Sequence, residues 1–211
     1  MQAEAGREGT QLDNAKRFPH DKRNQMANGN QALIDLIGRE IRAQGPISFA
    51  RFMELALYHP VHGYYASGRA KIGRRGDYFT NVSVGSIFGR LLAAQFAQIW
   101  QLLRRPDTFR IVEQGAHDGT LAADVLNALR DSNPDCFRAL HYGIVEPFPV
   151  WRGRQQKKLN AFSGKVFWAA ALTELKPIVG VFFANELFDA LPVHLLSLVR
   201  GSWKELFVNV R

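Results

Sequence analysis

Cysteine is almost absent from this sequence, because Cys136 is the only one among 211 residues. A single thiol excludes an internal disulfide framework and a cysteine-rich zinc site. The chain also lacks an apolar run near the roughly 18 residues that a membrane-spanning helix needs. Its mixed acidic and basic N-terminal residues do not form a secretory signal. These absences predict a protein without a membrane span, in a reducing compartment such as the cytoplasm.

Positive charge is in excess, with a formal net charge of +8, and this raises nucleic-acid binding as an alternative. The cations form two local clusters: Arg69, Lys71, Arg74 and Arg75 in a glycine-flanked loop, and Arg152, Arg154, Lys157 and Lys158 on an expected helix. Neither cluster contains interleaved aromatic residues or a nucleic-acid-binding motif. We therefore expect a solvated basic surface and no nucleic-acid partner.

The first half of the chain predicts helices and no clear strand. Residues 1–29 are polar and aperiodic, which predicts a disordered tail. Apolar residues then recur at helical spacing in three segments, which are expected to run from Asn30 to Gly45-Pro46, from Ser48 to His59-Pro60, and from Ile87 to Leu103. Residues 30–106 are therefore expected to form an N-terminal helical subdomain.

After residue 106 the pattern changes to short apolar strands that alternate with helices. This alternation predicts an α/β domain over 107–211, with a parallel sheet that is covered on both faces. Arg200-Gly201-Ser202 separates the last two apolar runs and predicts a β-hairpin. The expected strands are 109–112, 141–145, 166–168 and 179–184, with helices at 120–130 and 150–159.

The turn after the first strand carries the pattern of a cofactor loop. It places Glu113 at the strand end, and Gly115 and Gly119 around the start of the next helix. Gly115 permits a tight turn close to a ligand, and Gly119 is expected to let the helix pack against the strand. Free N–H groups at the helix start are candidates to hold an anion. The turn lacks the G-x-G-x-x-G of dinucleotide sites because His117 replaces the central glycine. A tight turn without a ligand remains the alternative.

Glu146 ends the second strand and is a candidate partner for a ribose. A carboxylate there accepts hydrogen bonds from two hydroxyl groups at once, as a nucleoside ligand in a doubly wound sheet requires. The alternative is an ordinary surface glutamate at a strand end.

Three polar residues follow the fourth strand, where an acceptor substrate would meet the cofactor. Asn185 is a candidate to orient an acceptor group, and Glu186 or Asp189 to hold a cationic nucleophile and take its proton. A helix N-cap role for Asn185 is the competing interpretation.

Four ordered motifs resemble the MidA-like methyltransferases. They are GPISFARFMELALYHPVHGYY (45–65), GDYFTNVSVGSIFGRLL (76–92), VEQGAHDGTLAADVL (112–126) and FANELFDALPVH (183–194). The resemblance covers residues 45–211. It implies a Rossmann-like class I methyltransferase sheet, S-adenosyl-L-methionine as the methyl donor and a protein acceptor, with arginine as the suspected side chain.

The resemblance also implies a location and further site residues. The family includes a mitochondrial complex I assembly factor, so a eukaryotic member is expected in the mitochondrial matrix. Gly76, Asp77 and Thr80 are implied to lie near the cofactor, which adds them to Glu113, Gly115, Gly119 and Glu146.

The sequence departs from the family at three points. His117 stands in a loop that usually reads G-P-G-R-G-T, and Val82 and Ser83 replace a common Pro-Glu pair. Family members also continue beyond the hairpin, so the sheet is expected to be incomplete at its C-terminal end. These departures leave open a second function, an assembly or binding module that keeps the fold without catalysis.

Overall fold

The computed structural model describes residues 30–68 and 85–210. The predictions for residues 1–29 and for Gly76, Asp77, Thr80, Val82 and Ser83 lie outside these ranges. The described elements, in chain order, are α2 (Gln31–Gln44), β1 (Ile47–Ser48), α3 (Phe49–Tyr58), α4 (Ile87–Leu102), β2 (Phe109–Gln114), α5 (Thr120–Ser132), α6 (Pro134–Ala139), β3 (Leu140–Val145), α7 (Pro149–Lys158), η2 (Asn160–Phe162), β4 (Val166–Ala169), η3 (Leu172–Glu174), β5 (Gly180–Ala184), η4 (Phe188–Ala190), β6 (Leu196–Val199), β7 (Ser202–Glu205) and β8 (Phe207–Val208).

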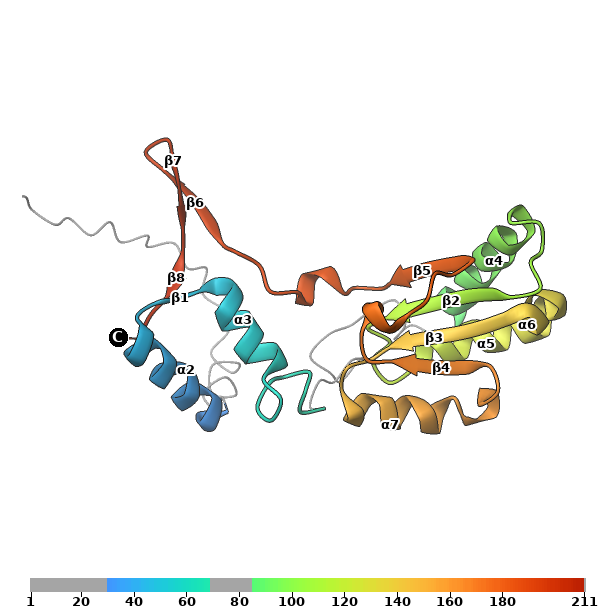
Figure 1. Cartoon of the computed structure of the whole chain (residues 1–211), viewed down its shortest axis with the longest axis horizontal. Helices are drawn as coiled ribbons and strands as arrows, with labels where there is room; N and C mark the ends of the chain where they lie inside the picture. The colour runs from blue at the N-terminus through green and yellow to red at the C-terminus, as the bar shows by residue number, and fades with distance from the viewer. Residues whose placement is uncertain (1–29, 69–84, 211) are drawn as a thin grey trace, which may run out of the picture.

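A four-stranded parallel sheet in the order β4-β3-β2-β5 forms the centre of the structure (Figure 1). The chain first moves outward from β2 to β3 and β4, and then returns to place β5 on the other side of β2. The strand order therefore reverses between β2 and β5. In an open α/β sheet, ligands bind beyond the carboxyl ends of the strands at such a reversal. The predicted Rossmann-like sheet is confirmed.

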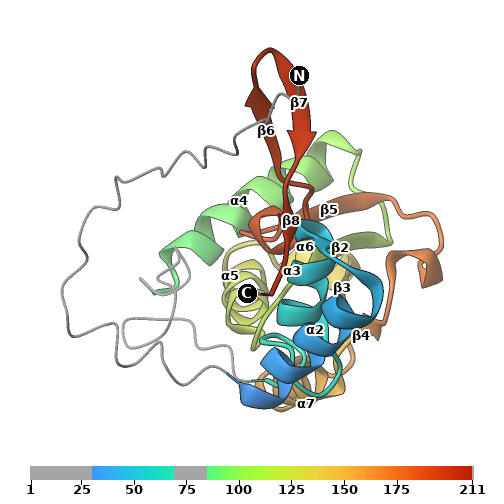
Figure 2. The same cartoon turned by 90° about the vertical axis from the view of Figure 1, so that its left-hand side faces the viewer.

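Helices cover only one face of this sheet in the described residues. Figure 2 shows α4, α5 and α7 in one layer on the same side of the strands. Phe109, Ile111, Tyr142 and Ile144 project into the core beneath this layer, where they meet Val125 and other apolar residues of α5. The connection between β4 and β5 crosses the opposite face (Figure 1), where Phe182 is 48% exposed. The expectation that both faces are covered is therefore not met in the described residues, because the connection between β4 and β5 contains only the single 3-10 turn η3 and no α-helix.

The N-terminal helices form a second, smaller core. The side chain of Asn30 accepts a hydrogen bond from the Leu33 amide, and that of Ser48 from the Arg51 amide, so each residue caps the start of the helix that was expected to begin there. Ile41, Ile47 and Leu55 are buried together, with Val208 packed against them. Val208 reaches this core because β8 pairs antiparallel with β1. The sequence pattern did not predict this pairing, since it joins two-residue strands from the two ends of the chain.

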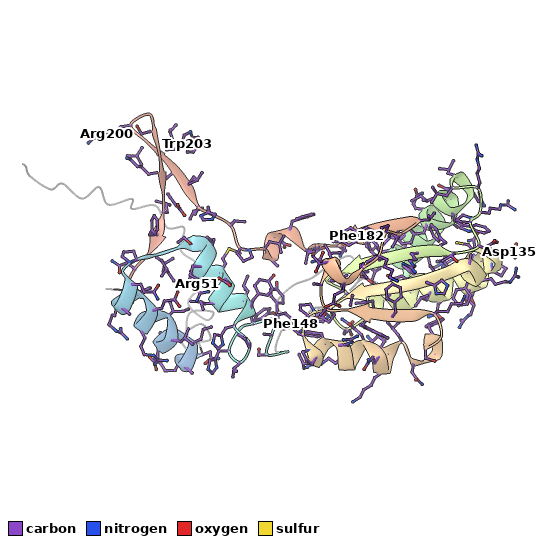
Figure 3. The ribbon with its side chains drawn as sticks, viewed as in Figure 1. Arg51, Asp135, Phe148, Phe182, Arg200 and Trp203 are labelled. Atoms are coloured by element: carbon purple, nitrogen blue, oxygen red, sulfur yellow. The ribbon has the colours of Figure 1, made fainter. Side chains whose placement is uncertain are left out.

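The predicted hairpin forms. Leu196–Val199 pairs with Ser202–Glu205 through a two-residue turn at Arg200 and Gly201. Both turn residues have positive φ, 48° and 79°, as the tight turns favoured between twisted antiparallel strands require. Figure 3 shows Arg200 and Trp203 on the part of the hairpin that projects from the body. The chain then leaves the hairpin to form β8.

Two further elements differ from the predictions. β2 extends to Gln114, because its pairing with β3 and β5 continues through two polar residues. The helix α6 was missed; Pro134 opens it directly after α5. The division after residue 106 stays a prediction, and α4 packs against α5 in the core of the sheet.

Candidate functional site

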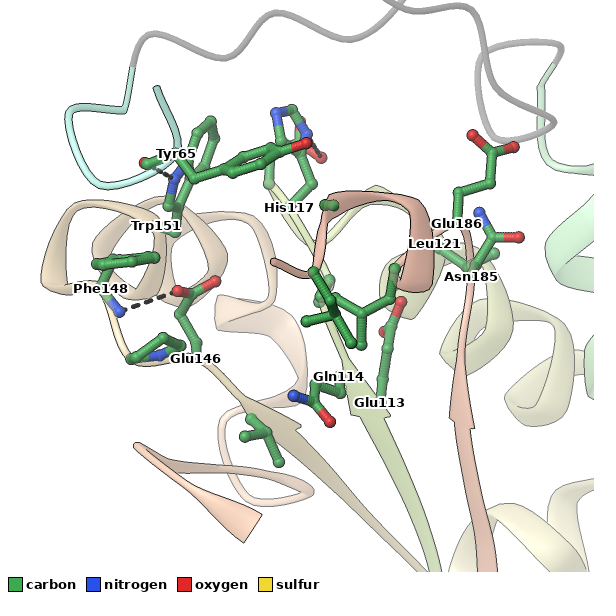
Figure 4. Close-up of a pocket in the computed structure, with 18 of the residues that line it drawn as sticks. Tyr65, Glu113, Gln114, His117, Leu121, Glu146, Phe148, Trp151, Asn185 and Glu186 are labelled. Atoms are coloured by element: carbon green, nitrogen blue, oxygen red, sulfur yellow. Dashed lines mark hydrogen bonds and ion pairs between the residues drawn. The ribbon is translucent and has the colours of Figure 1, made fainter. Parts of the chain in front are cut away.

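A pocket of about 250 Å³ opens at the carboxyl ends of β2, β3 and β5. Three connections line it: the glycine turn after β2, the segment that leads from β3 into α7, and the segment after β5. Tyr58 and Tyr65 add aromatic side chains from the N-terminal part of the chain. Figure 4 shows Tyr65, His117 and Trp151 on one side and Asn185 and Glu186 on the other. The pocket therefore brings together six of the predicted site residues: Glu113, Gly115, Glu146, Asn185, Glu186 and Asp189.

Both glycines of the turn adopt a conformation that disfavours other residues. Gly115 has φ +80° and Gly119 has φ +84°. A Cβ atom at position 115 would also lie 3.1 Å from Cδ1 of Leu187, on the segment after β5. A Cβ atom at position 119 would lie 3.5 Å from Gln155 of α7 and from Leu159, the residue after that helix, so Gly119 also allows a close approach to α7 that the sequence did not predict.

His117 does not fill the turn with its ring. Its φ is 47°, and the ring packs against the indole of Trp151 with 4.3 Å between centroids. The His117 carbonyl accepts a hydrogen bond of 2.8 Å from Nε2 of Gln155. The non-glycine residue is thus accommodated by α7, and it adds an imidazole to the pocket wall.

The N-terminus of α5 binds an internal carboxylate, that of Asp118. Oδ1 of Asp118 accepts hydrogen bonds from the Thr120 amide at 3.0 Å and from the Thr120 hydroxyl at 2.7 Å, and Lys158 contacts Oδ2 at 2.5 Å. Burial alone would raise the pKa of Asp118, but hydrogen bonds from His117, Lys158 and Thr120 hold it well below its ordinary value. The prediction of free N–H groups was wrong for Thr120. This amide is therefore already occupied and is not available to a phosphate ligand.

Glu113 is a buried carboxyl group at the pocket floor, near the end of β2. It accepts a hydrogen bond of 2.7 Å from the hydroxyl of Tyr142 on β3. Burial raises the pKa of Glu113 to about 7, although the hydrogen bond from Tyr142 lowers it. The carboxyl therefore keeps its proton to a higher pH than an exposed glutamate does.

Glu146 follows β3 directly and is 6% exposed, so the interpretation as an ordinary surface glutamate was wrong. Oε1 accepts from the Phe148 amide at 2.9 Å and Oε2 from Nε2 of Gln155 at 3.0 Å. Burial raises the pKa of Glu146, while these two hydrogen bonds and the nearby His117 lower it. Each oxygen has one donor from the chain and keeps a lone pair for a ligand hydroxyl.

The segment after β5 supplies the opposite wall of the pocket. Asn185 does not cap the following short helix η4, whose N-cap is Leu187, so the competing N-cap interpretation is not supported. Glu186 and Asp189 are exposed, and Glu186 has φ 49°. The hydroxyl of Tyr58 donates to the Ala190 carbonyl at 2.8 Å, which fastens this segment to the end of α3.

Sequence reasoning missed the aromatic wall and the glutamine behind it. The rings of Tyr58 and Phe148 are stacked with centroids 6.3 Å apart, and Nε1 of Trp151 donates to the Tyr65 carbonyl at 2.7 Å. The run of aromatic residues before Gly68 was a usable signal for the wall. Nothing in the local pattern distinguishes Gln155 from its neighbour Gln156.

Three of the four basic residues of α7 make contacts within the chain. Arg154 donates to the Gly68 carbonyl at 3.0 Å and stacks over Trp151, Arg152 contacts the Trp168 carbonyl, and Lys158 pairs with Asp118. The loop cluster at 69–75 lies outside the described residues. The absence of a nucleic-acid partner stays a prediction.

The described part of the chain offers a site for an organic ligand, not for a metal. Within it no three histidine, cysteine, aspartate or glutamate side chains group as metal ligands, and no helix is both long and apolar enough to cross a bilayer. The two oxygens of Glu146 and the aromatic wall suit a nucleoside.

Comparison with known proteins identifies the family. Residues 91–211 match a family described as "Putative S-adenosyl-L-methionine-dependent methyltransferase". The chain belongs to this methyltransferase family. The resemblance predicted from the four motifs is therefore confirmed.

Two groups of relatives support the assignment. The mitochondrial protein arginine methyltransferase NDUFAF7 homolog of Drosophila melanogaster is 32% identical over 86% of this chain and 46% of its own length. The human NDUFAF7 is 28% identical over 81% and 43%. A crystal structure from Burkholderia thailandensis with bound S-adenosyl-homocysteine matches with TM-score 0.75 and 32% identity, over 94% of this chain and 50% of that one. The chain thus spans about half the length of the relatives that it matches.

Proposed function

We propose that this chain binds S-adenosyl-L-methionine in the pocket between β2, β3 and β5 and takes part in methylation of a protein side chain, with arginine as the favoured acceptor. The observation that supports this most is the buried Glu146, whose two oxygens each have one internal donor at the tip of β3. The bound S-adenosyl-homocysteine of the Burkholderia structure and the arginine methyltransferase relatives support the same assignment.

Each cofactor-binding residue is proposed to contact a different part of the ligand. Glu146 takes the ribose hydroxyls, and Phe148 lies beside the expected position of the base. Gly115 and Gly119 shape the turn for the amino-acid end, with Glu113 as a carboxylate for its amino group. Gly76, Asp77 and Thr80, outside the described residues, remain proposed contributors through the family resemblance.

The acceptor is proposed to enter from the side of the segment after β5. When bound, S-adenosyl-L-methionine supplies an electrophilic methyl group. A guanidinium nitrogen that takes this group has to lose a proton, and Glu186 and Asp189 are the carboxylates placed to hold the cation and receive it. Asn185 is proposed to orient the acceptor by hydrogen bonding. Proximity and alignment supply most of the rate enhancement in such a transfer.

A matched pair of variants tests the donor site. Titration calorimetry of the full chain with S-adenosylhomocysteine should show binding, and Glu146→Gln should weaken it by about tenfold to a hundredfold, since hydrogen bonds to a charged group are lost. Glu186→Gln, on the acceptor side, should leave this affinity unchanged and lower the yield of methylarginine on a peptide acceptor. No heat at millimolar ligand with the unmodified chain would overturn the proposal.

A binding or assembly module without catalysis is the second candidate. It is favoured by the exposure of Glu186 and Asp189, because methyl transfer needs an acceptor site from which water is excluded. This function predicts S-adenosylhomocysteine binding without methylarginine formation, and partner binding that is unchanged in Glu186→Gln.

The NDUFAF7 relatives are mitochondrial proteins. A mitochondrial matrix location is therefore proposed if the protein is eukaryotic.

A further inference from the structure

Gln155 is a fully buried glutamine on α7, with 0% of its surface exposed. Its neighbours on the helix, Arg154 and Gln156, are exposed. Burial of a primary amide is unfavourable unless its donors and acceptor are satisfied. The partners of Gln155 therefore account for its position in the core.

Three partners from three different strands or turns surround this amide. Nε2 donates to the His117 carbonyl of the glycine turn at 2.8 Å and to Oε2 of Glu146 at 3.0 Å. Oε1 accepts from Nε1 of Trp168 on β4 at 2.9 Å. One side chain thus joins the turn after β2, the acid after β3 and the strand β4.

The chemistry of these partners fixes the orientation of the amide. An indole N–H only donates, so the atom that faces Trp168 has to be the oxygen of Gln155. The NH₂ group then faces a carbonyl and a carboxylate, both of which only accept. In a flipped amide the single oxygen would face both of these acceptors and the NH₂ group would face the indole N–H. Only one orientation therefore satisfies all three contacts.

We propose that Gln155 is a positioning residue for the nucleoside site, which holds the Glu146 carboxylate and the glycine turn at a fixed separation. This inference rests on the proposed function. With Gln155 on Oε2 and the Phe148 amide on Oε1, the carboxylate cannot rotate without losing a hydrogen bond. Its remaining lone pairs are therefore presented in one direction, toward the pocket.

The same residue also sets the position of the turn. The Gln155 backbone lies against Gly119, where a Cβ atom would be 3.5 Å from the Gln155 Cα. The His117 carbonyl is fixed by Nε2 while the His117 ring packs on Trp151, one helical turn before Gln155. A change at Gln155 is thus expected to weaken the contacts of both the ribose, at Glu146, and the amino-acid end of the ligand, at the glycine turn.

A merely structural glutamine and a positioning glutamine differ in one measurable way. Loss of a structural hydrogen bond lowers the free energy of unfolding but leaves the folded site unchanged. Loss of a positioning contact also lowers the ability of the site to recognise a ribose diol. The discriminating measurement is therefore the preference for adenosine over 2′,3′-dideoxyadenosine, not stability alone.

The test compares Gln155→Met with Gln156→Met, which makes the same change at the exposed neighbouring position. Binding of S-adenosylhomocysteine is measured by calorimetry on the full chain, and the two nucleosides are compared as competitors. We expect Gln155→Met to lower the affinity for S-adenosylhomocysteine by about tenfold and to reduce the preference for adenosine over 2′,3′-dideoxyadenosine. Gln156→Met should leave both quantities unchanged. Trp168→Phe, which removes only the donor to Oε1, should shift both quantities in the same direction by about threefold. It serves as the second variant if Gln155→Met does not fold.

A ligand-free measurement keeps the two proposals separable. Carbon-13 titration of the Glu146 carboxyl should show a higher pKa in Gln155→Met than in the unmodified chain, because the hydrogen bond from Gln155 lowers this pKa. If the unmodified chain does not bind S-adenosylhomocysteine, the proposed function fails, while this titration still decides whether Gln155 controls Glu146. If the chain binds but the variant keeps its affinity, its diol preference and its Glu146 pKa, the positioning role alone is overturned.

Discussion

Glu113 combines a central position in the sheet with an unfavourable environment for charge. It lies on the middle strand β2, between β3 and β5, and burial raises its pKa to about 7. Its partner Tyr142 is also buried, and burial together with the nearby Glu113 raises the pKa of that phenol. Burial therefore disfavours the charged form of both side chains. The carboxyl is therefore a site where stability and ligand binding are both coupled to pH.

The sign of the pH effect follows from the raised pKa. The folded chain keeps a proton on Glu113 up to about pH 7, whereas the unfolded chain releases it near pH 4.5. The free energy of unfolding should therefore fall as pH rises from about 4.5 to 7, by about 3 kcal/mol at most. Glu113→Gln should lack this decline. Chemical denaturation at several pH values measures it, and an equal slope in the variant would contradict the assignment.

Tyr142→Phe provides the matched control. The hydrogen bond from Tyr142 lowers the pKa of Glu113, so its removal should extend the decline to higher pH without abolishing it. Other groups that titrate in this range contribute equally in the unmodified chain, in Glu113→Gln and in Tyr142→Phe. Their contribution to the free energy of unfolding therefore cancels in the comparison.

At the scale of elements, the crossing of α4 over α5 depends on a glycine. Gly89 is buried on α4, and a Cβ atom there would lie 2.4 Å from Cβ of Asp124 on α5. The two helices therefore approach more closely than any side chain at this position permits. The close crossing lets Phe96 and Trp100 of α4 reach the core of the sheet.

The same substitution at two helical glycines tests this contact. Gly89→Ala should destabilise the chain by about 1–3 kcal/mol, because the added methyl forces the helices apart. Gly153→Ala, on α7, meets no atom within 4 Å and should stabilise by about 0.5–1 kcal/mol through helix propensity. The free energy of unfolding from urea titration measures both. Equal effects at the two positions would show that the crossing is not limited by Gly89.

The elements also show which features a sequence pattern can predict. Helical periodicity located α4, and the strand-end rule brought Glu113, Glu146 and Asn185 to one pocket, because parallel strands end at one edge. The pairing of β8 with β1 was not predictable, since two-residue strands carry no periodic signal. Burial of Gln155 likewise depends on Trp168 and His117, which approach it only in the folded chain. Local patterns therefore located the acids but not the group that orients one of them.

At the scale of the whole molecule, the N-terminal part is fastened to the sheet at the rim of the pocket. Tyr58 donates to the Ala190 carbonyl, Trp151 to the Tyr65 carbonyl and Arg154 to the Gly68 carbonyl. Two of these contacts connect the N-terminal segment with α7 and one with the segment after β5. The pocket is thus formed by both parts of the chain, and ligand binding is expected to stabilise their association.

The C-terminal segment carries an apolar surface that the described residues leave uncovered. On the hairpin Leu198 is 58% and Trp203 69% exposed, and Phe182 is half exposed on β5, whose outer edge pairs with no strand in the described residues. Exposed apolar side chains on the hairpin and the unpaired edge of β5 are two separate features, and each favours association between chains.

We therefore expect the isolated 211-residue chain to self-associate at micromolar concentration. The double variant Leu198→Ser with Trp203→Ser should shift it toward the monomer, because both side chains lie in the uncovered hairpin. Leu102→Ser is the matched control. Leu102 is 83% exposed at the end of α4, and Figure 1 shows α4 and the hairpin at opposite sides of the view, so this replacement should leave the association unchanged. Sedimentation velocity over a range of concentrations measures the distribution. A monomeric unmodified chain, or an equal shift in Leu102→Ser, would contradict the assignment of association to the hairpin.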